Sequence, residues 1–104
     1  MIEKIKGSEV CDGVYYAKYT SEYYGFSISY LDGRLIDIIV HPKKYLMPII
    51  EVHIEGKNAS YKFDFSDIRV ADTEKRQVFK ERFALAEDFL DNELKPFVWD
   101  LLNK

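Results

Sequence analysis

The chain has few of the features that tie a protein to an oxidising or membrane environment. It contains one cysteine, Cys11, in 104 residues, so it cannot form a disulfide within itself. No apolar run is as long as a transmembrane helix, and the first six residues, MIEKIK, do not form the apolar core of a signal peptide. We therefore expect a single domain over residues 1–104 and a cytoplasmic location, with Cys11 as a packed thiol.

The chain also lacks the motifs that mark common catalytic and metal sites. Its two histidines, His41 and His53, belong to no His-x-His or His-Glu-x-x-His pattern, and a metal ion needs three or four converging ligands. There is no Gly-x-Ser-x-Gly elbow and no glycine-rich phosphate loop. The net charge of −3 is not that of a nucleic-acid-binding polycation. We expect no metal, no cofactor and no enzymatic activity.

Apolar residues, by contrast, make up 47% of the chain, and their spacing is informative. In the last third, residues 73–103, they recur every three or four positions, which is typical of one side of an α-helix. The apolar positions are Phe79, Phe83, Ala86, Leu90, Leu94, Phe97 and Leu101. Asp72 or Thr73 is expected to cap the start of this helix.

Pro96 interrupts the helical pattern. A proline has no amide hydrogen, so within a helix it would lose the bond to the carbonyl of Asn92, at a cost of ~3 kcal/mol if nothing compensates. We expect a helix to about Asp91, then a kink or a short break, then a second segment. Asn92 could cap that second segment, with Pro96 in its first turn.

The chain before residue 73 alternates apolar and polar residues, which is the pattern of β-strands with one buried face. We expect about five strands that start at residue 14, with residues 2–5 as an edge strand or a loose arm and residues 67–70 as a last short strand. The fold class is therefore α+β: an antiparallel meander with the C-terminal helical region packed on one face.

The turns set the expected registers. A four-residue loop in the first hairpin pairs Tyr19 with Tyr24, Ala17 with Phe26 and Tyr15 with Ile28. In the second hairpin we favour a three-residue loop, Leu31-Asp32-Gly33, with a bulge after it over a two-residue turn at Asp32-Gly33, because it faces Ile28 with Ile36 and keeps the large residues together. In the third, Ile54 faces Ala59, Val52 faces Tyr61, Ile50 faces Phe63, and Glu51 faces Lys62.

The segment from His41 to Pro48 is the best local candidate for recognition of a partner. It is longer than a hairpin turn requires, and a proline near each end limits the entropy it would lose on binding. The expected partner-binding residues are Lys43, Lys44, Tyr45, Leu46 and Met47. The alternative is that Leu46 and Met47 tuck over one end of the sheet while the two lysines only keep the loop soluble.

The end of the helix offers a second surface. One helix can cover only part of such a sheet, and the last segment is apolar nearly all round, so we expect a homodimer or a stable complex with a protein partner. The interface residues would be Phe97, Trp99 and Leu102.

Two functions follow from these surfaces. The first is a non-enzymatic protein-binding or regulatory module, of the bacterial or phage accessory type, that sequesters or inhibits a macromolecular partner. The alternative is a single-stranded nucleic-acid-binding protein, because aromatic and basic side chains on a sheet can stack with bases and neutralise phosphates. The residues of that alternative face are Tyr16, Lys18, Tyr23 and Lys62.

Overall fold

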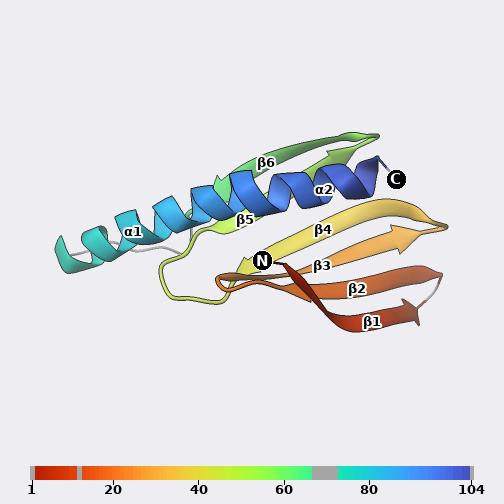
Figure 1. The fold of residues 1–104 in the computed structure, drawn as a ribbon, viewed down its shortest axis with the longest axis horizontal. Helices are drawn as coiled ribbons and strands as arrows, with labels where there is room; N and C mark the ends of the chain where they lie inside the picture. Colours follow the sequence, from red (N-terminus) through yellow and green to blue (C-terminus); the bar gives the residue numbers. More distant parts are fainter. Residues whose placement is uncertain (1, 12, 67–72, 104) are drawn as a thin grey trace.

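The computed structural model describes residues 2–11, 13–66 and 73–103, and within them six strands form one antiparallel sheet (Figure 1). The strands lie side by side in chain order, which confirms the predicted meander and the α+β class. They are β1 (Glu3–Cys11), β2 (Val14–Thr20), β3 (Tyr24–Leu31), β4 (Arg34–Pro42), β5 (Ile49–Glu55) and β6 (Asn58–Asp64). The count is six because the N-terminal residues form an edge strand, and the strand predicted at residues 67–70 lies outside the described residues.

The C-terminal region is one continuous helix of 30 residues, so the short break, one of the two predicted alternatives, is wrong (Figure 1). It consists of α1 (Thr73–Phe89), the π-helical segment η1 (Leu90–Leu94) and α2 (Lys95–Leu102). The backbone N–H of Lys95 donates to the carbonyl of Leu90, five residues earlier. Asn92 lies inside the helix instead of capping it, and its side-chain amide donates to Asp88 Oδ1 at 2.6 Å.

The π-helical segment keeps the buried face of the helix in line. Ala86, Leu90, Leu94 and Val98 are all buried and are each four residues apart. In an α-helix, residues four apart drift by about 40° around the axis, so three such steps would rotate Val98 by about 120° away from Ala86. A wider turn takes up an extra residue and rotates the later positions back. The segment also precedes Pro96, which lies in the first turn of α2 as predicted.

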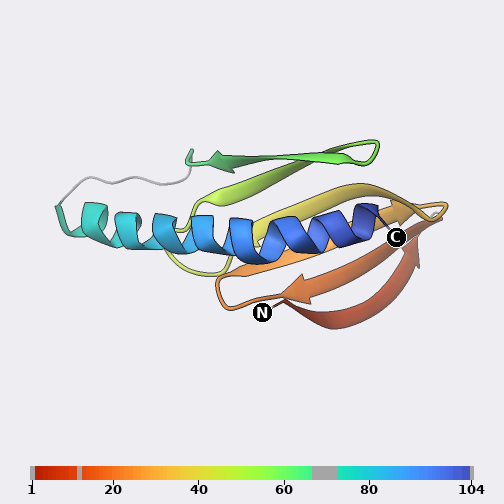
Figure 2. The same ribbon diagram turned by 45° about the horizontal axis from the view of Figure 1, so that its top comes forward.

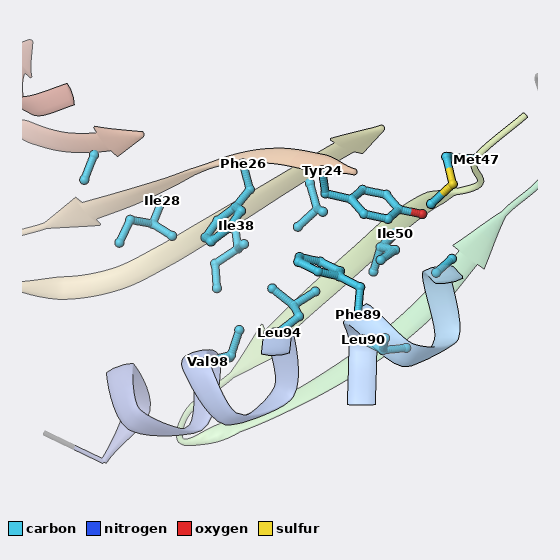
Figure 3. Packing of buried hydrophobic residues seen from close by; sticks show 13 residues of the cluster. Tyr24, Phe26, Ile28, Ile38, Met47, Ile50, Phe89, Leu90, Leu94 and Val98 are labelled. Atoms are coloured by element: carbon cyan, nitrogen blue, oxygen red, sulfur yellow. The ribbon is translucent and has the colours of Figure 1, made fainter. Parts of the chain in front are cut away.

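The hydrophobic core lies between one face of the sheet and this helix (Figures 2 and 3). Tyr24 and Phe26 of β3 are at its centre, and the ring of Tyr24 stacks on Phe89 with 4.9 Å between centroids. Phe97 of α2 meets the rings of Phe26 and Tyr19 edge to face, at 5.3 and 5.0 Å. The sheet therefore buries one face and leaves the opposite face, here called the outer face, without a covering element among the described residues.

The first hairpin is tighter at its turn than predicted. Tyr19 pairs with Phe26 and not with Tyr24, so the whole predicted register of this hairpin is wrong by two residues. Ser21 explains the difference, because its N–H and its hydroxyl both donate to the carbonyl of Tyr24, at 2.8 and 2.9 Å. Tyr24 thus starts β3 instead of pairing with β2. A shift of two residues leaves every side chain on its predicted face.

The second hairpin has a two-residue turn at Asp32-Gly33 and not the three-residue loop that we predict. Leu31 pairs directly with Arg34, and the turn residues Asp32 and Gly33 have φ angles of 51° and 77°. Two successive left-handed residues are characteristic of a type I′ turn, whose twist matches that of the strands it joins. The predicted three-residue loop is therefore wrong.

The predicted bulge exists, but farther from the turn. The register shifts between Ser29 and Tyr30, where Ile36 is the extra residue on β4. Ile28 consequently pairs with Ile38, which is buried, and Ile36 is exposed instead of facing Ile28 as predicted. Because the bulge adds one residue to β4, the hairpin can have a type I′ turn at Asp32-Gly33 and still bury its large residues on one face. In the third hairpin all four predicted pairs, from Ile54–Ala59 to Ile50–Phe63, are confirmed.

The helix is longer than the sheet beneath it. Thirty residues span about 45 Å in a helix, whereas a seven-residue strand spans about 23 Å. The first half of α1 therefore projects past the end of the sheet (Figures 1 and 2). The longest dimension of the molecule is 49 Å and its radius of gyration is 14.9 Å, against about 13 Å for a compact domain of this length. No described helix is long and apolar enough to cross a membrane.

Candidate protein interaction surfaces

The loop between β4 and β5 presents only part of the predicted recognition set to solvent. Tyr45 is 68% exposed and Lys44 is exposed as well, whereas Leu46 and Met47 are buried. Met47 belongs to the core cluster and lies at one end of it (Figure 3). Leu46 and Met47 therefore lie as the alternative interpretation predicts, packed over the sheet. In this conformation a partner could contact the loop through Lys43, Lys44 and Tyr45.

Side-chain hydrogen bonds at both ends hold that loop on the sheet. The hydroxyl of Tyr24 donates to the carbonyl of Pro48 at 2.6 Å, and burial raises the pKa of this hydroxyl well above its ordinary value. At the other end of the loop, Lys43 Nζ donates to Thr20 Oγ1 at 2.9 Å and to the carbonyl of Ser21 at 2.8 Å. The exposed loop residues thus start from a fixed backbone, which lowers the entropy that binding would cost.

The three predicted interface residues of the C-terminal helix have different surroundings. Phe97 packs against the rings of Tyr19 and Phe26, so it belongs to the core. Trp99 is 65% exposed, and Leu102 is half-buried beside it. Of the three residues, Trp99 and the exposed part of Leu102 are therefore available to a partner.

Trp99 stands at the rim of a hollow of about 670 Å³ between α2 and β6, here called the Trp99 hollow. Its lining combines aromatic rings with amide and ammonium groups. The lining residues are Lys57, Asn58, Ala59, Tyr61, Lys95, Trp99, Leu102 and Asn103. Lys95 Nζ lies 5.7 Å from the centre of the Tyr61 ring and pairs with Asp91 at 3.0 Å. Such a hollow can hold an apolar side chain of a partner with an acidic group beside it.

The residues of the predicted nucleic-acid face do not gather into one patch. Tyr16 and Lys18 are exposed on β2, Tyr23 is half-buried in the turn that follows, and Lys62 lies on β6 opposite Glu51. Four strand spacings separate β2 from β6, or roughly 19 Å. The structure therefore separates Lys62 from Tyr16 and Lys18 on the outer face, whereas Tyr23 packs against the core.

Lys18 instead shares a hollow of about 430 Å³ on the outer face with Lys43 of the loop. Gly25 lies in the floor of this hollow, and a Cβ atom built on it would be 3.1 Å from Nε2 of His41. Ile39, which is 56% exposed, completes the rim. This places one residue of the nucleic-acid set beside one residue of the loop set.

A further hollow of about 430 Å³ lies on the helix side of β1–β3, where the helix does not cover the sheet. Lys4 and three tyrosines line it, and the rings of Tyr15 and Tyr30 meet edge to face at 5.8 Å. Burial raises the pKa of the Tyr30 hydroxyl, with a smaller contribution from Tyr19 and Tyr15. These hydroxyls can donate hydrogen bonds to a bound polar group.

The structure contains a cluster of four partly exposed phenylalanines beneath the projecting part of α1, which we did not predict from the sequence. Phe63 of β6 and Phe65, just after it, contact Phe79 and Phe83 of α1, with ring centroids 5.2 to 5.8 Å apart. Phe65 is 41% exposed, and the other three are only partly buried. Comparing the length of the helix with that of the strands would have shown that one end of the helix must overhang the sheet.

The end of β6 also carries a fixed charge. Asp64 Oδ1 accepts a hydrogen bond from the backbone N–H of Ser66 at 2.9 Å. This bond lowers the pKa of the Asp64 carboxyl below its usual value, and the positive charge of Lys62 lowers it further. Elsewhere, the described side chains include no group of three or more His, Cys, Asp or Glu residues that could hold a metal ion.

Comparisons with known proteins give no relative for this chain: no family model, no curated protein and no solved structure matches it.

Proposed function

We propose that this chain is a non-enzymatic protein-binding or regulatory module that works as a homodimer in the cytoplasm and sequesters or inhibits a macromolecular partner. The observation that supports it best is the position of Trp99, which leaves 65% of its side chain in solvent at the rim of the Trp99 hollow. Tryptophan is among the residues most enriched at the energetic centres of protein interfaces. Covering a large exposed indole with a partner removes apolar surface from water, which favours binding.

The chemistry of the Trp99 hollow indicates the kind of partner segment that would fit it. Trp99 and Tyr61 offer aromatic faces for an apolar or aromatic anchor. Lys57 and Lys95 add two ammonium groups to the same lining, and these favour an acidic residue next to the anchor. We therefore expect a protein partner that presents an apolar residue together with a carboxylate.

Site-specific photo-crosslinking tests this proposal. A photoreactive phenylalanine analogue would replace Trp99 in one variant and Asp37, which is exposed on the outer face of β4, in the control. We expect a crosslinked protein from position 99 that position 37 does not give. The purified partner should then bind the Trp99→Ala variant at least about tenfold more weakly than the Asp37→Ala variant.

Two results would contradict the proposal. If position 99 gave the same crosslinks as position 37, the Trp99 hollow would have no specific partner. If the purified partner bound Trp99→Ala normally but lost affinity for Tyr45→Ala, the loop between β4 and β5 would be the binding surface instead, because Tyr45 is the other highly exposed aromatic residue of these two surfaces.

A further inference from the structure

The two edges of the sheet differ in a way that bears on self-association. β1 forms one edge, and its register against β2 shifts twice, between Lys4 and Lys6 and between Lys6 and Glu9. Irregular edges of this kind prevent pairing with another sheet. The other edge, β6, pairs with β5 over seven consecutive residues without a shift and contains no proline. β6 is therefore the edge that can accept a further strand.

The hairpin geometry identifies which backbone groups of β6 face outward. The pair Glu55–Asn58 closes a two-residue turn, and such a closing pair is hydrogen-bonded in a tight hairpin. Hydrogen-bonded and non-hydrogen-bonded pairs then alternate along the strands. Ala59, Tyr61 and Phe63 therefore direct their backbone N–H and C=O groups away from β5. Figures 1 and 2 show no described segment beyond β6 on that side.

The four-phenylalanine cluster adjoins this edge. Its rings lie on the helix side of the sheet, and Phe63 and Phe65 alternate with the outer-face residues Lys62 and Asp64 along the end of β6. The cluster is apolar and only partly buried, because the projecting part of α1 has little of the sheet beneath it. A strand added to β6 would bring further side chains against the open side of these rings.

The charges of β6 are complementary to those of a second copy of the same strand. Lys62 and Asp64 flank Phe63 and lie on the outer face. In an antiparallel pair related by a twofold axis at Phe63, Lys62 of each copy faces Asp64 of the other. The same register faces Tyr61 with Phe65 on the helix side, and aromatic and opposite-charge pairs are the favourable cross-strand combinations.

We propose that two copies of the chain pair antiparallel along β6 about a twofold axis at Phe63, so that their phenylalanine clusters join into one apolar core. This inference rests on the homodimer in the proposed function and specifies the surface that forms it. The assembly is a continuous twelve-stranded sheet with both helices on one face. Its interface is isologous, because each copy contributes the same strand and the same charges.

Other registers of the same strand fit less well. An axis at Lys62 would face two lysines with each other, which is unfavourable across a strand pair. An axis at Tyr61 would face Lys62 with Ser60 and Asp64 with Asn58, so neither charge would have an opposite charge. Only the axis at Phe63 gives two reciprocal ion pairs between Lys62 and Asp64. The register therefore makes a specific prediction about charge reversal.

The test measures the dissociation constant of the dimer by analytical ultracentrifugation and native mass spectrometry. The variants are Lys62→Glu, Asp64→Lys and the control Lys18→Glu, which reverses an exposed lysine on the outer face far from β6. We expect the two β6 variants to raise the dissociation constant about tenfold or more, because each replaces two ion pairs by two like-charge pairs. The control should leave it unchanged.

A mixture of Lys62→Glu with Asp64→Lys provides the decisive result. In the mixed dimer every facing pair is again of opposite charge, so a one-to-one heterodimer should form while each variant alone stays mainly monomeric. Thermal unfolding of each variant checks its fold, because Lys62→Glu places a second glutamate opposite Glu51 and Asp64→Lys loses the bond from Ser66. Rescue in the mixture cannot come from a misfolded chain.

Three other outcomes would overturn the inference at different levels. A wild-type chain that stays monomeric at millimolar concentration would remove both the pairing and the homodimer, while partner binding at Trp99 would be judged by its own crosslinking test. A dimer that ignores charge reversal at Lys62 and Asp64 would move the interface away from β6. Variants that weaken the dimer without rescue in the mixture would exclude the axis at Phe63.

Discussion

Replacing Tyr24 by phenylalanine should destabilise the protein by about 1–3 kcal/mol, the usual cost of leaving a buried acceptor without its donor. Tyr24 has no exposed surface, and its hydroxyl donates to the carbonyl of Pro48 at 2.6 Å. Phenylalanine keeps the stacking on Phe89 but leaves that carbonyl, which is also buried, without its partner. For a chain of this length the loss corresponds to a fall in melting temperature of roughly 5–14 °C.

The assay is thermal unfolding followed by circular dichroism, with Tyr45→Phe as the matched control. Tyr45 is 68% exposed, so its variant should melt within about 2 °C of the wild type, as surface substitutions usually do. An unchanged melting temperature for Tyr24→Phe would refute the reasoning, because it would mean that the bond to Pro48 does not hold the loop. The exposed loop residues would then lack the fixed backbone that we assign to them.

The same variant makes a second prediction about pH. Burial raises the pKa of the Tyr24 hydroxyl, so the folded protein keeps this proton in a range where the unfolded chain, with a pKa near 10, releases it. The stability that this tyrosine contributes is therefore complete below pH 10 and is lost above it, by up to about 1.4 kcal/mol per pH unit. Between pH 9 and 11, wild-type stability should fall more steeply than that of Tyr24→Phe, and parallel curves would contradict the assignment.

Two further substitutions test local features of the fold. Pro96→Ala should change stability by less than about 1 kcal/mol, because the packing of Leu90 and Leu94 sets the π-helical segment; a gain near 3 kcal/mol would instead show that the proline imposes it. Gly25→Ala should displace the imidazole of His41, since the new methyl group would lie 3.1 Å from Nε2. Its cost should disappear in a His41→Ala background, and an equal cost in both backgrounds would place the strain in the backbone.

The sequence allowed the third hairpin to be predicted residue by residue but not the first two. At Gly56 the turn preference and the alternation of apolar residues agree, so only one register satisfies both. In the first hairpin the alternation permits registers that differ by two residues, and the choice depends on how the Ser21 hydroxyl bonds to Tyr24. In the second, the turn and the alternation disagree, and the bulge at Ile36 satisfies both. The alternation of apolar residues therefore predicts which face of the sheet a residue lies on better than it predicts the residue opposite it on the next strand.

The position of the irregularity in the helix was predicted correctly, but the short break, one of its two predicted forms, does not occur. The missing amide hydrogen of Pro96 marks where α-helical bonding must change, and η1 ends two residues before it. A break would have exposed backbone groups next to the core, whereas a π-helical turn keeps them bonded. The π-helical turn also keeps Leu94 and Val98 facing the sheet. The need for this turn depends on the shape of the sheet, so the helical sequence alone could not predict it.

The candidate surfaces depended still more on information that the sequence does not contain. Trp99 and Phe97 have similar hydrophobicity and are two residues apart, yet one is 65% exposed and the other packs on Tyr19 and Phe26. Which of them is buried follows from the rotation of α2, which the π-helical segment sets. The spread of Lys18 and Lys62 over roughly 19 Å likewise follows from strand order in space.

The two proposals use opposite ends of the same overlong helix, and this leads to a prediction about stoichiometry. Pairing about Phe63 faces Tyr61 of each copy with Phe65 of the other, and Tyr61 also lines the Trp99 hollow, so the two proposals share this one residue. The other lining residues, among them Trp99, Lys57 and Lys95, lie outside the paired segment. A dimer formed in this way keeps both hollows for partners. We therefore expect a complex of two chains with two partner molecules, measurable as a mass by native mass spectrometry. A complex of one chain with one partner, formed at the expense of the dimer, would mean that the partner and the second copy compete for β6.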